Sequence, residues 1–188
     1  MKFTVAELEQ EAVDFDESLA PAVIDYVEEM RQVGPLHAAG RADLLKEHRG
    51  PQEIVADIRV RASLQTRMEL PCARCLDPVV QMVDSTFDLL FRPVGVDADG
   101  VDRSITASET EIGYYEGDGL LLEDVLREQV LLALPAKTLC SEDCKGLCAE
   151  CGRNRNTDPC NCAAAPADPR WAALQAINLQ AVRSRVKS

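Results

Sequence analysis

Residues 140–162 read CSEDCKGLCAECGRNRNTDPCNC and hold six of the eight cysteines of this 188-residue chain. The six form three close pairs, and a fourth pair lies upstream in the sequence PCARC at residues 71–75. Thiolates only a few residues apart can converge on one ion, and Zn²⁺ takes four of them in a closed structural site. The sequence therefore predicts one or two zinc ions, held by Cys72, Cys75, Cys140, Cys144, Cys148, Cys151, Cys160 and Cys162.

Other uses of the eight cysteines remain open at this point. The first ten residues turn acidic and lack the apolar core of a signal peptide, so we expect a cytoplasmic protein whose thiols stay reduced. Clustered pairs in a reduced chain favour a metal site over disulfides or redox-active thiols. An iron–sulfur cluster also fits cysteine-only ligation. We prefer zinc, but the cysteine pattern does not by itself distinguish zinc from iron. Gly152, directly after Cys151, allows the positive φ that turns backbone amides toward bound sulfurs.

The cysteines can be divided into two four-ligand sites in two ways. One division is local: it places the pairs at 140/144 and 148/151 around one ion and leaves Cys72 and Cys75 with Cys160 and Cys162. The other, which we favour, groups Cys72, Cys75, Cys140 and Cys144 and leaves Cys148, Cys151, Cys160 and Cys162 together. The compact CAECG turn and the loop back to CNC suit a self-contained site. An ion that joins 72–75 to 140–144 would close a long loop of chain and tie the cysteine segment to the sheet.

Alternation of apolar and polar side chains predicts a hairpin around the upstream pair. Residues 58–70 alternate between apolar and polar side chains, which is typical of a half-buried antiparallel strand, and residues 79–92 form a second run. The PCARC turn would be the tip of this hairpin. Residues 36–45 are a further candidate strand, whereas 1–10 are undecided and 14–33 show no firm period.

The remaining segments complete an α+β prediction: an antiparallel β-sheet with a covering helix and a C-terminal cysteine-rich zinc-binding segment. Residues 94–119 are predicted to be a loop with one short strand, and 120–134 a helix that covers the sheet. A last helix would begin at Asp168. The predicted parts are 1–135, a β-rich domain with the hairpin and a helix; 136–165, the metal-binding segment; and 166–188, the C-terminal helix.

Charge and missing motifs narrow the function classes. The net charge of −12 repels bulk phosphate and argues against a general nucleic-acid coat, while a basic protein partner stays possible. No apolar run reaches the roughly 20 residues that span a bilayer, so we expect no membrane association. No phosphate-binding or nucleophile motif is present, and an all-cysteine zinc site has no open position for water. We therefore expect no enzymatic activity and no small-molecule substrate.

Several motifs together resemble the YceD family of large ribosomal RNA subunit accumulation proteins. They are PCARCLD at 71–77, LP at 134–135, CSEDCKGLCAECG at 140–152, NRN at 154–156, CNC at 160–162 and DPRWAAL at 168–174. The resemblance covers roughly residues 55–175. Arg155 departs from the family, which often has leucine between the two asparagines. The resemblance implies a non-enzymatic role in accumulation or processing of 23S ribosomal RNA and assembly of the large subunit, with a ribosomal RNA precursor or a large-subunit ribosomal protein as partner.

Two functions of different classes follow. The first is a zinc-stabilised ribosome-assembly factor that binds its partner through basic side chains: Arg59, Arg61 and Arg67 on one strand face, and Lys145, Arg153 and Arg155 beside the cysteines. The strand arginines could instead pair with acids on neighbouring strands. The second is a thiol oxidoreductase or metal-transfer protein with an exposed Cys-x-x-Cys, which requires a low thiol pKa and a labile metal.

Overall fold

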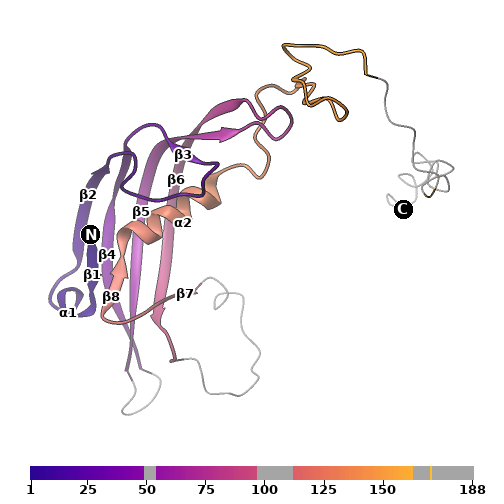
Figure 1. Cartoon of the computed structure of the whole chain (residues 1–188). Helices are drawn as coiled ribbons and strands as arrows, with labels where there is room; N and C mark the ends of the chain where they lie inside the picture. Colours follow the sequence, from indigo (N-terminus) through magenta and orange to yellow (C-terminus); the bar gives the residue numbers. More distant parts are fainter. Residues whose placement is uncertain (49–53, 97–111, 163–169, 171–188) are drawn as a thin grey trace, which may run out of the picture. The chain divides into compact units, whose positions relative to one another are not determined.

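A computed structural model describes residues 1–48, 54–96, 112–162 and 170 (Figure 1). The chain divides into two compact units, Met1–Ala73 with Asp77–Glu142, and Arg74–Leu76 with Asp143–Ser188. The first unit contains all the named elements, which are β1 (Lys2–Thr4), α1 (Val5–Leu8), β2 (Val13–Leu19), β3 (Arg31–Gln32), β4 (Leu36–His48), β5 (Ile54–Pro71), β6 (Pro78–Pro93), β7 (Ile112–Tyr115), β8 (Gly119–Leu121) and α2 (Leu122–Ala133).

The predicted hairpin is confirmed as the centre of the larger sheet. β5 pairs antiparallel with β6 from Ile58↔Phe91 to Pro71↔Pro78, and the PCARC turn joins the two strands. The buried face of β5 carries the alternating apolar residues, including Ile58, Val60 and Leu64. β4 pairs antiparallel with β5 and confirms the strand predicted at 36–45, although it continues to His48. The sequence HRGP at 48–51 predicts a turn after this strand, but His48 is the last residue of β4, and residues 49–51 lie outside the described residues.

Two strands in the acidic N-terminal segment were not predicted. β2 pairs antiparallel with β4 along its length, and β3 pairs with β5. In the β2–β4 pair Phe15 lies opposite Gly40, where a Cβ would approach the carbonyl oxygen of Arg61 to 2.2 Å. Close packing at this point requires glycine. β2 is a short strand whose polar residues are mostly acidic, and it gives almost no sequence signal because pairing with β4 decides its structure.

The larger sheet is mixed, which corrects the purely antiparallel sheet expected from the sequence. Its strand order is β2-β4-β5-β6-β7, with β3 beside β5. β7, the short strand expected between 94 and 119, pairs with β6 in parallel, and residues 97–111 of the predicted loop lie outside the described residues. β1 and β8 form a separate two-stranded sheet. The helix predicted at 120–134 begins at Leu122 and ends at Ala133, because residues up to Leu121 pair with β1 as strand β8.

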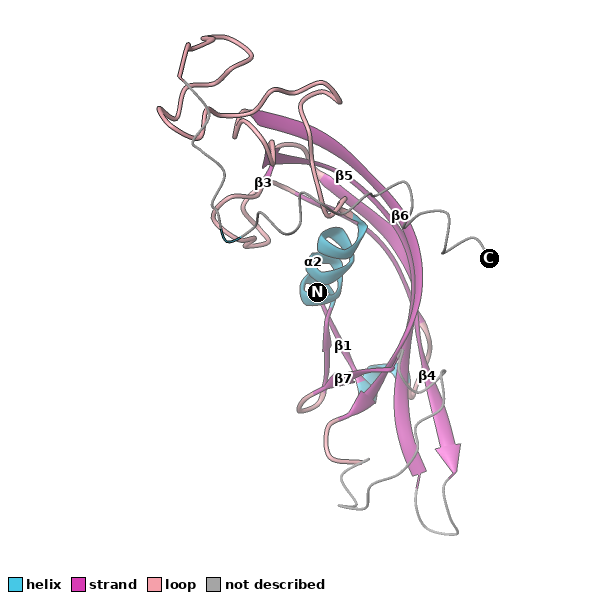
Figure 2. Ribbon diagram, turned by 90° about the vertical axis from the view of Figure 1, so that its right-hand side faces the viewer, coloured by secondary structure: helices cyan, strands magenta, loops and turns pink. Residues whose placement is uncertain are grey.

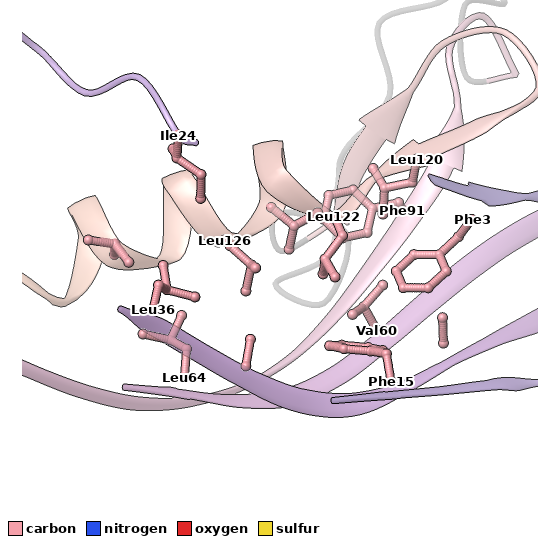
Figure 3. Close-up of a cluster of buried hydrophobic side chains, with 14 of the residues drawn as sticks. Phe3, Phe15, Ile24, Leu36, Val60, Leu64, Phe91, Leu120, Leu122 and Leu126 are labelled. Carbon is pink, nitrogen blue, oxygen red and sulfur yellow. The ribbon is translucent and has the colours of Figure 1, made fainter. Parts of the chain in front are cut away.

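Helix α2 lies on the concave side of the curved strands β4, β5 and β6 (Figure 2). It buries Leu122, Val125, Leu126 and Val130 in the same apolar core as the sheet residues. Figure 3 shows Leu122 and Leu126 directed toward the strands, and Phe3 beside Phe15. The two phenylalanine rings lie 5.4 Å apart between their centroids. Burying each large apolar side chain contributes about 1.5–3 kcal/mol, so this core accounts for most of the stability of the first unit.

Arg92 and Asp57 form an ion pair in the interior of the first unit. The guanidinium of Arg92 donates to both carboxylate oxygens of Asp57, from Nε at 3.0 Å and from Nη2 at 2.8 Å. Nη2 also donates to Glu47 at 2.6 Å. The side chains of Arg92 and Asp57 are 5% and 4% exposed, so the buried charge of Asp57 depends on Arg92 for compensation.

The C-terminal part of the predictions is largely untested. The helix expected at 166–188 lies outside the described residues except for Arg170, and the three-part division therefore stays a prediction. No helix in the described ranges is both long and apolar enough to cross a membrane.

Candidate metal centres

Both Cys-x-x-Cys sequences form the same backbone turn. The N–H of Cys72 donates to the carbonyl oxygen of Asp77, and that of Cys148 to Arg153, each at 2.8 Å and each to the fifth residue onward. The residue after the second cysteine has a left-handed backbone in both turns, with φ of 66° at Leu76 and 71° at Gly152. The glycine expected to allow this conformation does so, and the leucine adopts it without that help.

The eight thiols come together in two groups of four. Cys72, Cys75, Cys140 and Cys144 form one group, and Cys148, Cys151, Cys160 and Cys162 the other, with the sulfurs of each group within 4.8 Å of one another. Four sulfurs bound to one tetrahedral zinc would lie about 3.8 Å apart, given Zn–S bonds of about 2.3 Å. Each group can hold a metal ion with small adjustments. The grouping is the favoured one of the two divisions considered from the sequence.

Local hydrogen bonds position Cys72 and Cys140 near each other. The N–H of Cys140 donates to the sulfur of Cys72 at 3.4 Å, and the N–H of Ala73 donates to the carbonyl oxygen of Thr138 at 2.8 Å. Cys72, Cys75 and Cys144 are all less than 5% exposed, whereas Cys140 is exposed. A largely buried thiolate set is costly without a compensating cation, so this group is the better suited of the two to a permanent structural ion.

Asn156 braces the chain around Cys144. Its side-chain nitrogen donates to the sulfur of Cys144 at 3.3 Å, and its side-chain oxygen accepts from the N–H of Lys145 at 2.8 Å. Arg74 adds a second brace, because its guanidinium donates to the carbonyl oxygen of Cys144 at 2.9 Å. Such contacts orient metal ligands and tune the charge on sulfur. Sequence reasoning saw the NRN motif but missed this role of Asn156.

Close packing of the thiols in the second group, Cys148, Cys151, Cys160 and Cys162, shifts their pKa values in opposite directions. Backbone amide hydrogen bonds from Cys151 and then Glu150 lower the pKa of Cys148 to about 6. Hydrogen bonds with the sulfurs of Cys151 and Cys160, together with burial, raise the pKa of Cys162 to about 12. Four thiolates this close repel one another, and only a cation between them removes that repulsion. Cys148 therefore loses its proton more readily than an ordinary thiol, and Cys162 less readily.

The sequence comparisons identify the family. Residues 60–178 match the family described as "Large ribosomal RNA subunit accumulation protein YceD". The chain belongs to the YceD family. The uncharacterized proteins Rv2926c of Mycobacterium tuberculosis and Mb2951c of Mycobacterium bovis are each 35% identical to it over 103 residues, 55% of this chain and 47% of theirs. The uncharacterized protein ML1660 of Mycobacterium leprae is 29% identical over 127 residues, 65% of this chain and 54% of its own.

The matches cover only part of each relative. The chain spans about half the length of the curated relatives it matches. No solved structure matches the chain. The family match includes β5 from Val60 onward, β6, α2 and all eight cysteines, so both candidate metal centres lie within the YceD region.

The strand arginines of this YceD protein are mostly engaged with acids. Arg59 donates to both carboxylate oxygens of Asp88 on β6, at 2.7 and 2.6 Å, and Arg61 donates to Asp43 on β4 at 2.8 Å. The hydrogen bond from Arg59 lowers the pKa of Asp88, so the carboxylate stays ionised. Arg67 is exposed, and its guanidinium lies beside Gly34. Cross-strand pairing thus holds two of the three predicted partner-binding arginines on this face of the sheet.

The basic residues of the second unit are more accessible. Arg153 lies 3.6 Å from Asp158, and both side chains are more than half exposed, so this contact is worth about 1 kcal/mol or less. Lys145 and Arg155 are exposed. The described residues 74–76 and 143–162 hold four bases (Arg74, Lys145, Arg153, Arg155) against three acids (Asp143, Glu150, Asp158), in a chain whose net charge is −12.

Proposed function

We propose that this YceD-family protein promotes the accumulation or processing of 23S ribosomal RNA and the assembly of the large ribosomal subunit in the cytoplasm, by binding and without catalysis. The observation that carries the proposal is the family match over residues 60–178, whose description names accumulation of the large-subunit RNA. The described residues add two four-cysteine groups suited to structural metal. A mixed sheet with a covering helix and a zinc-bound cysteine segment would be the α+β scaffold.

We take zinc to be the metal of both sites. All-thiolate tetrahedral sets suit zinc as a structural ion, and the set has no position reserved for a reacting water. Cys72, Cys75, Cys140 and Cys144 would hold one ion, and Cys148, Cys151, Cys160 and Cys162 the other. Zinc then supports the cysteine segment and the backbone turns that carry the basic residues.

Contact with RNA is assigned to Lys145, Arg153 and Arg155. Their side chains lie beside the cysteine turns, and binding phosphate breaks at most one weak surface ion pair, that of Arg153 with Asp158. Arg59 and Arg61 would instead have to break their short ion pairs with Asp88 and Asp43. Arg67 remains a further candidate on the sheet. A large-subunit ribosomal protein is the alternative partner.

Depletion of the protein should lower the ratio of 23S to 16S ribosomal RNA in growing cells. Wild-type protein should restore the ratio. A variant with Lys145→Gln, Arg153→Gln and Arg155→Gln should restore it poorly, because it lacks the proposed phosphate contacts. The matched control carries Arg31→Gln, Arg41→Gln and Lys46→Gln, three exposed bases of the first unit whose surface ion pairs contribute little.

An unchanged 23S-to-16S ratio after depletion would contradict the proposal. Equal rescue by the two triple variants would contradict the assignment of RNA contact to the second unit. The zinc content of both variants should be measured alongside, because a loss of metal would explain poor rescue without any loss of RNA contact.

The alternative is a thiol oxidoreductase or metal-transfer protein. The lowered pKa of Cys148, about 6 through its backbone amide bonds, is the observation in its favour. Thiol alkylation of the native protein separates the two functions. Fast modification without loss of fold supports the alternative, and protection until a chelator is added supports structural zinc.

A further inference from the structure

Strand β6 has a long edge without a neighbouring strand in the described part of the chain. β5 pairs with one side of β6 along nearly its full length, from Pro78 to Phe91. On the other side β7 covers only Leu90–Pro93, which leaves the edge at residues 78–89. The backbone N–H and C=O groups of such an edge are a template for one more strand.

The edge lacks the usual protection against strand pairing. Natural edge strands carry lysine, proline or inward-pointing charge to prevent association. Between Pro78 and Arg92 strand β6 has no basic residue, and it exposes Met82 at 72% and Val80 at 54%. Two exposed apolar side chains on one open edge favour a docking site.

A groove lies at one end of this edge, where β6 meets β7 and helix α2. Asp88, Leu89 and Phe91 of β6 line a cavity of about 360 Å³, together with Ile112 and Gly113 of β7 and with Glu128, Gln129 and Leu132 of α2. A second cavity of about 470 Å³ lies along α2 and shares Glu128 and Leu132 with the first. Leu132 is 70% exposed although it borders both cavities. The groove has space for apolar side chains of a segment that pairs with β6.

The charge along this surface selects the occupant. Three acids, Asp88, Asp124 and Glu128, line the two cavities against one base, Arg127. On the neighbouring strand β5, Arg59 pairs with Asp88, Arg61 pairs with Asp43, and Arg67 lies opposite Met82. A basic segment meets the carboxylates of the groove favourably, whereas a second copy of a chain with net charge −12 brings acids against acids. RNA is repelled by the same carboxylates.

We propose that residues 78–89 of β6, with the groove beside α2, bind an extended basic segment of a partner protein as an additional strand. Backbone hydrogen bonds along β6 would supply the pairing. Apolar side chains of the segment would fill the groove and cover Met82 and Val80, and its basic side chains would meet the carboxylates. This goes beyond the proposed function, because it holds whether or not the second unit contacts RNA.

The test uses the full-length protein and a fluorescent synthetic peptide that alternates lysine or arginine with valine or isoleucine. We expect saturable binding by fluorescence anisotropy. N-methylation of alternate peptide amides should weaken binding about tenfold or more, because it removes the donors for strand pairing. The double variant Val80→Lys with Met82→Lys should weaken it by a similar factor, because lysine on an edge strand opposes pairing and repels the basic peptide.

Val23→Lys with Val27→Lys is the matched control, because these valines are 53% and 52% exposed and the change in charge is the same. It should leave the affinity within about twofold. Absence of binding to wild-type protein overturns the proposal, as does equal weakening by the two double variants. Binding of a short single-stranded RNA that the β6 variant alone abolishes would assign the edge to nucleic acid. A wild-type dimer in light scattering that the β6 variant alone dissociates would assign it to a second copy.

Discussion

Replacing Cys72 and Cys75 with serine is expected to lower the zinc content of the purified protein from about two ions per chain to about one. Both thiols belong to the more buried group, with Cys140 and Cys144, and two remaining ligands do not hold a structural ion tightly. Apparent binding energies of structural zinc reach about 10–16 kcal/mol in small domains, which is comparable to the whole stability of a typical protein. We therefore expect a large fall in melting temperature. Metal analysis after purification without chelator gives the stoichiometry.

Cys148→Ser with Cys160→Ser is the matched variant for the other group. It should also remove about one ion, but it should leave the sheet of the first unit folded, because these cysteines contribute nothing to its core. Alkylation mapping identifies the thiols released in each variant. Exposure of Cys160 and Cys162 by the Cys72/Cys75 variant, with Cys140 still protected, would establish the local grouping instead. Less than about one metal ion in wild-type protein would contradict structural zinc altogether.

Substitution Arg92→Met should destabilise the protein by about 3–5 kcal/mol, because it leaves the carboxylate of Asp57 buried without its cation. Asp57 is 4% exposed and receives two hydrogen bonds from Arg92. The double variant Arg92→Met with Asp57→Leu should recover much of this loss, because no buried charge remains. Urea denaturation of the single and double variants measures the difference.

The exposed pair of Arg41 and Asp14 provides the comparison. Its atoms are 2.9 Å apart, as close as those of the buried pair, but the side chains are 48% and 72% exposed. Arg41→Met should therefore cost about 1 kcal/mol or less. Similar losses from Arg92→Met and Arg41→Met would show that burial does not decide the energy of the Arg92 pair.

Local pattern was sufficient to predict the parts of the fold with long regular elements. Alternation of apolar and polar residues over 58–70 predicted β5, and the run at 79–92 predicted β6, because a sheet with one buried face imposes a period of two. Helix α2 was predicted from its acidic first turn and apolar spacing, with an error of two residues at its start. That error has a tertiary cause, since Gly119–Leu121 pairs with β1 more than a hundred residues away.

The short strands could not be predicted because partners distant in sequence determine them. β2, β3 and β8 are only seven, two and three residues long, and each is completed by hydrogen bonds to β4, β5 or β1. The parallel pairing of β7 with β6 could likewise not be predicted from the four residues of β7. Pairing energy of this kind appears only when both strands are present.

The candidate metal centres were more predictable than the sheet edges, because cysteine spacing reports ligand geometry directly. The sequence identified all eight thiols and Gly152. It did not identify Leu76, which adopts the same left-handed backbone as Gly152 without being a glycine, because sequence rules associate that conformation with glycine. The brace by Asn156 was also hidden, since its contact with Cys144 depends on the folded turn.

Recovery of RNA cross-linked to the tagged, full-length protein in growing cells tests the central claim most directly. The account predicts strong enrichment of 23S precursor over 16S sequences, and loss of that enrichment when Lys145, Arg153 and Arg155 are replaced by glutamine while zinc content is unchanged. Recovery of 23S and 16S sequences in proportion to their abundance, with no effect of the triple substitution, would contradict it.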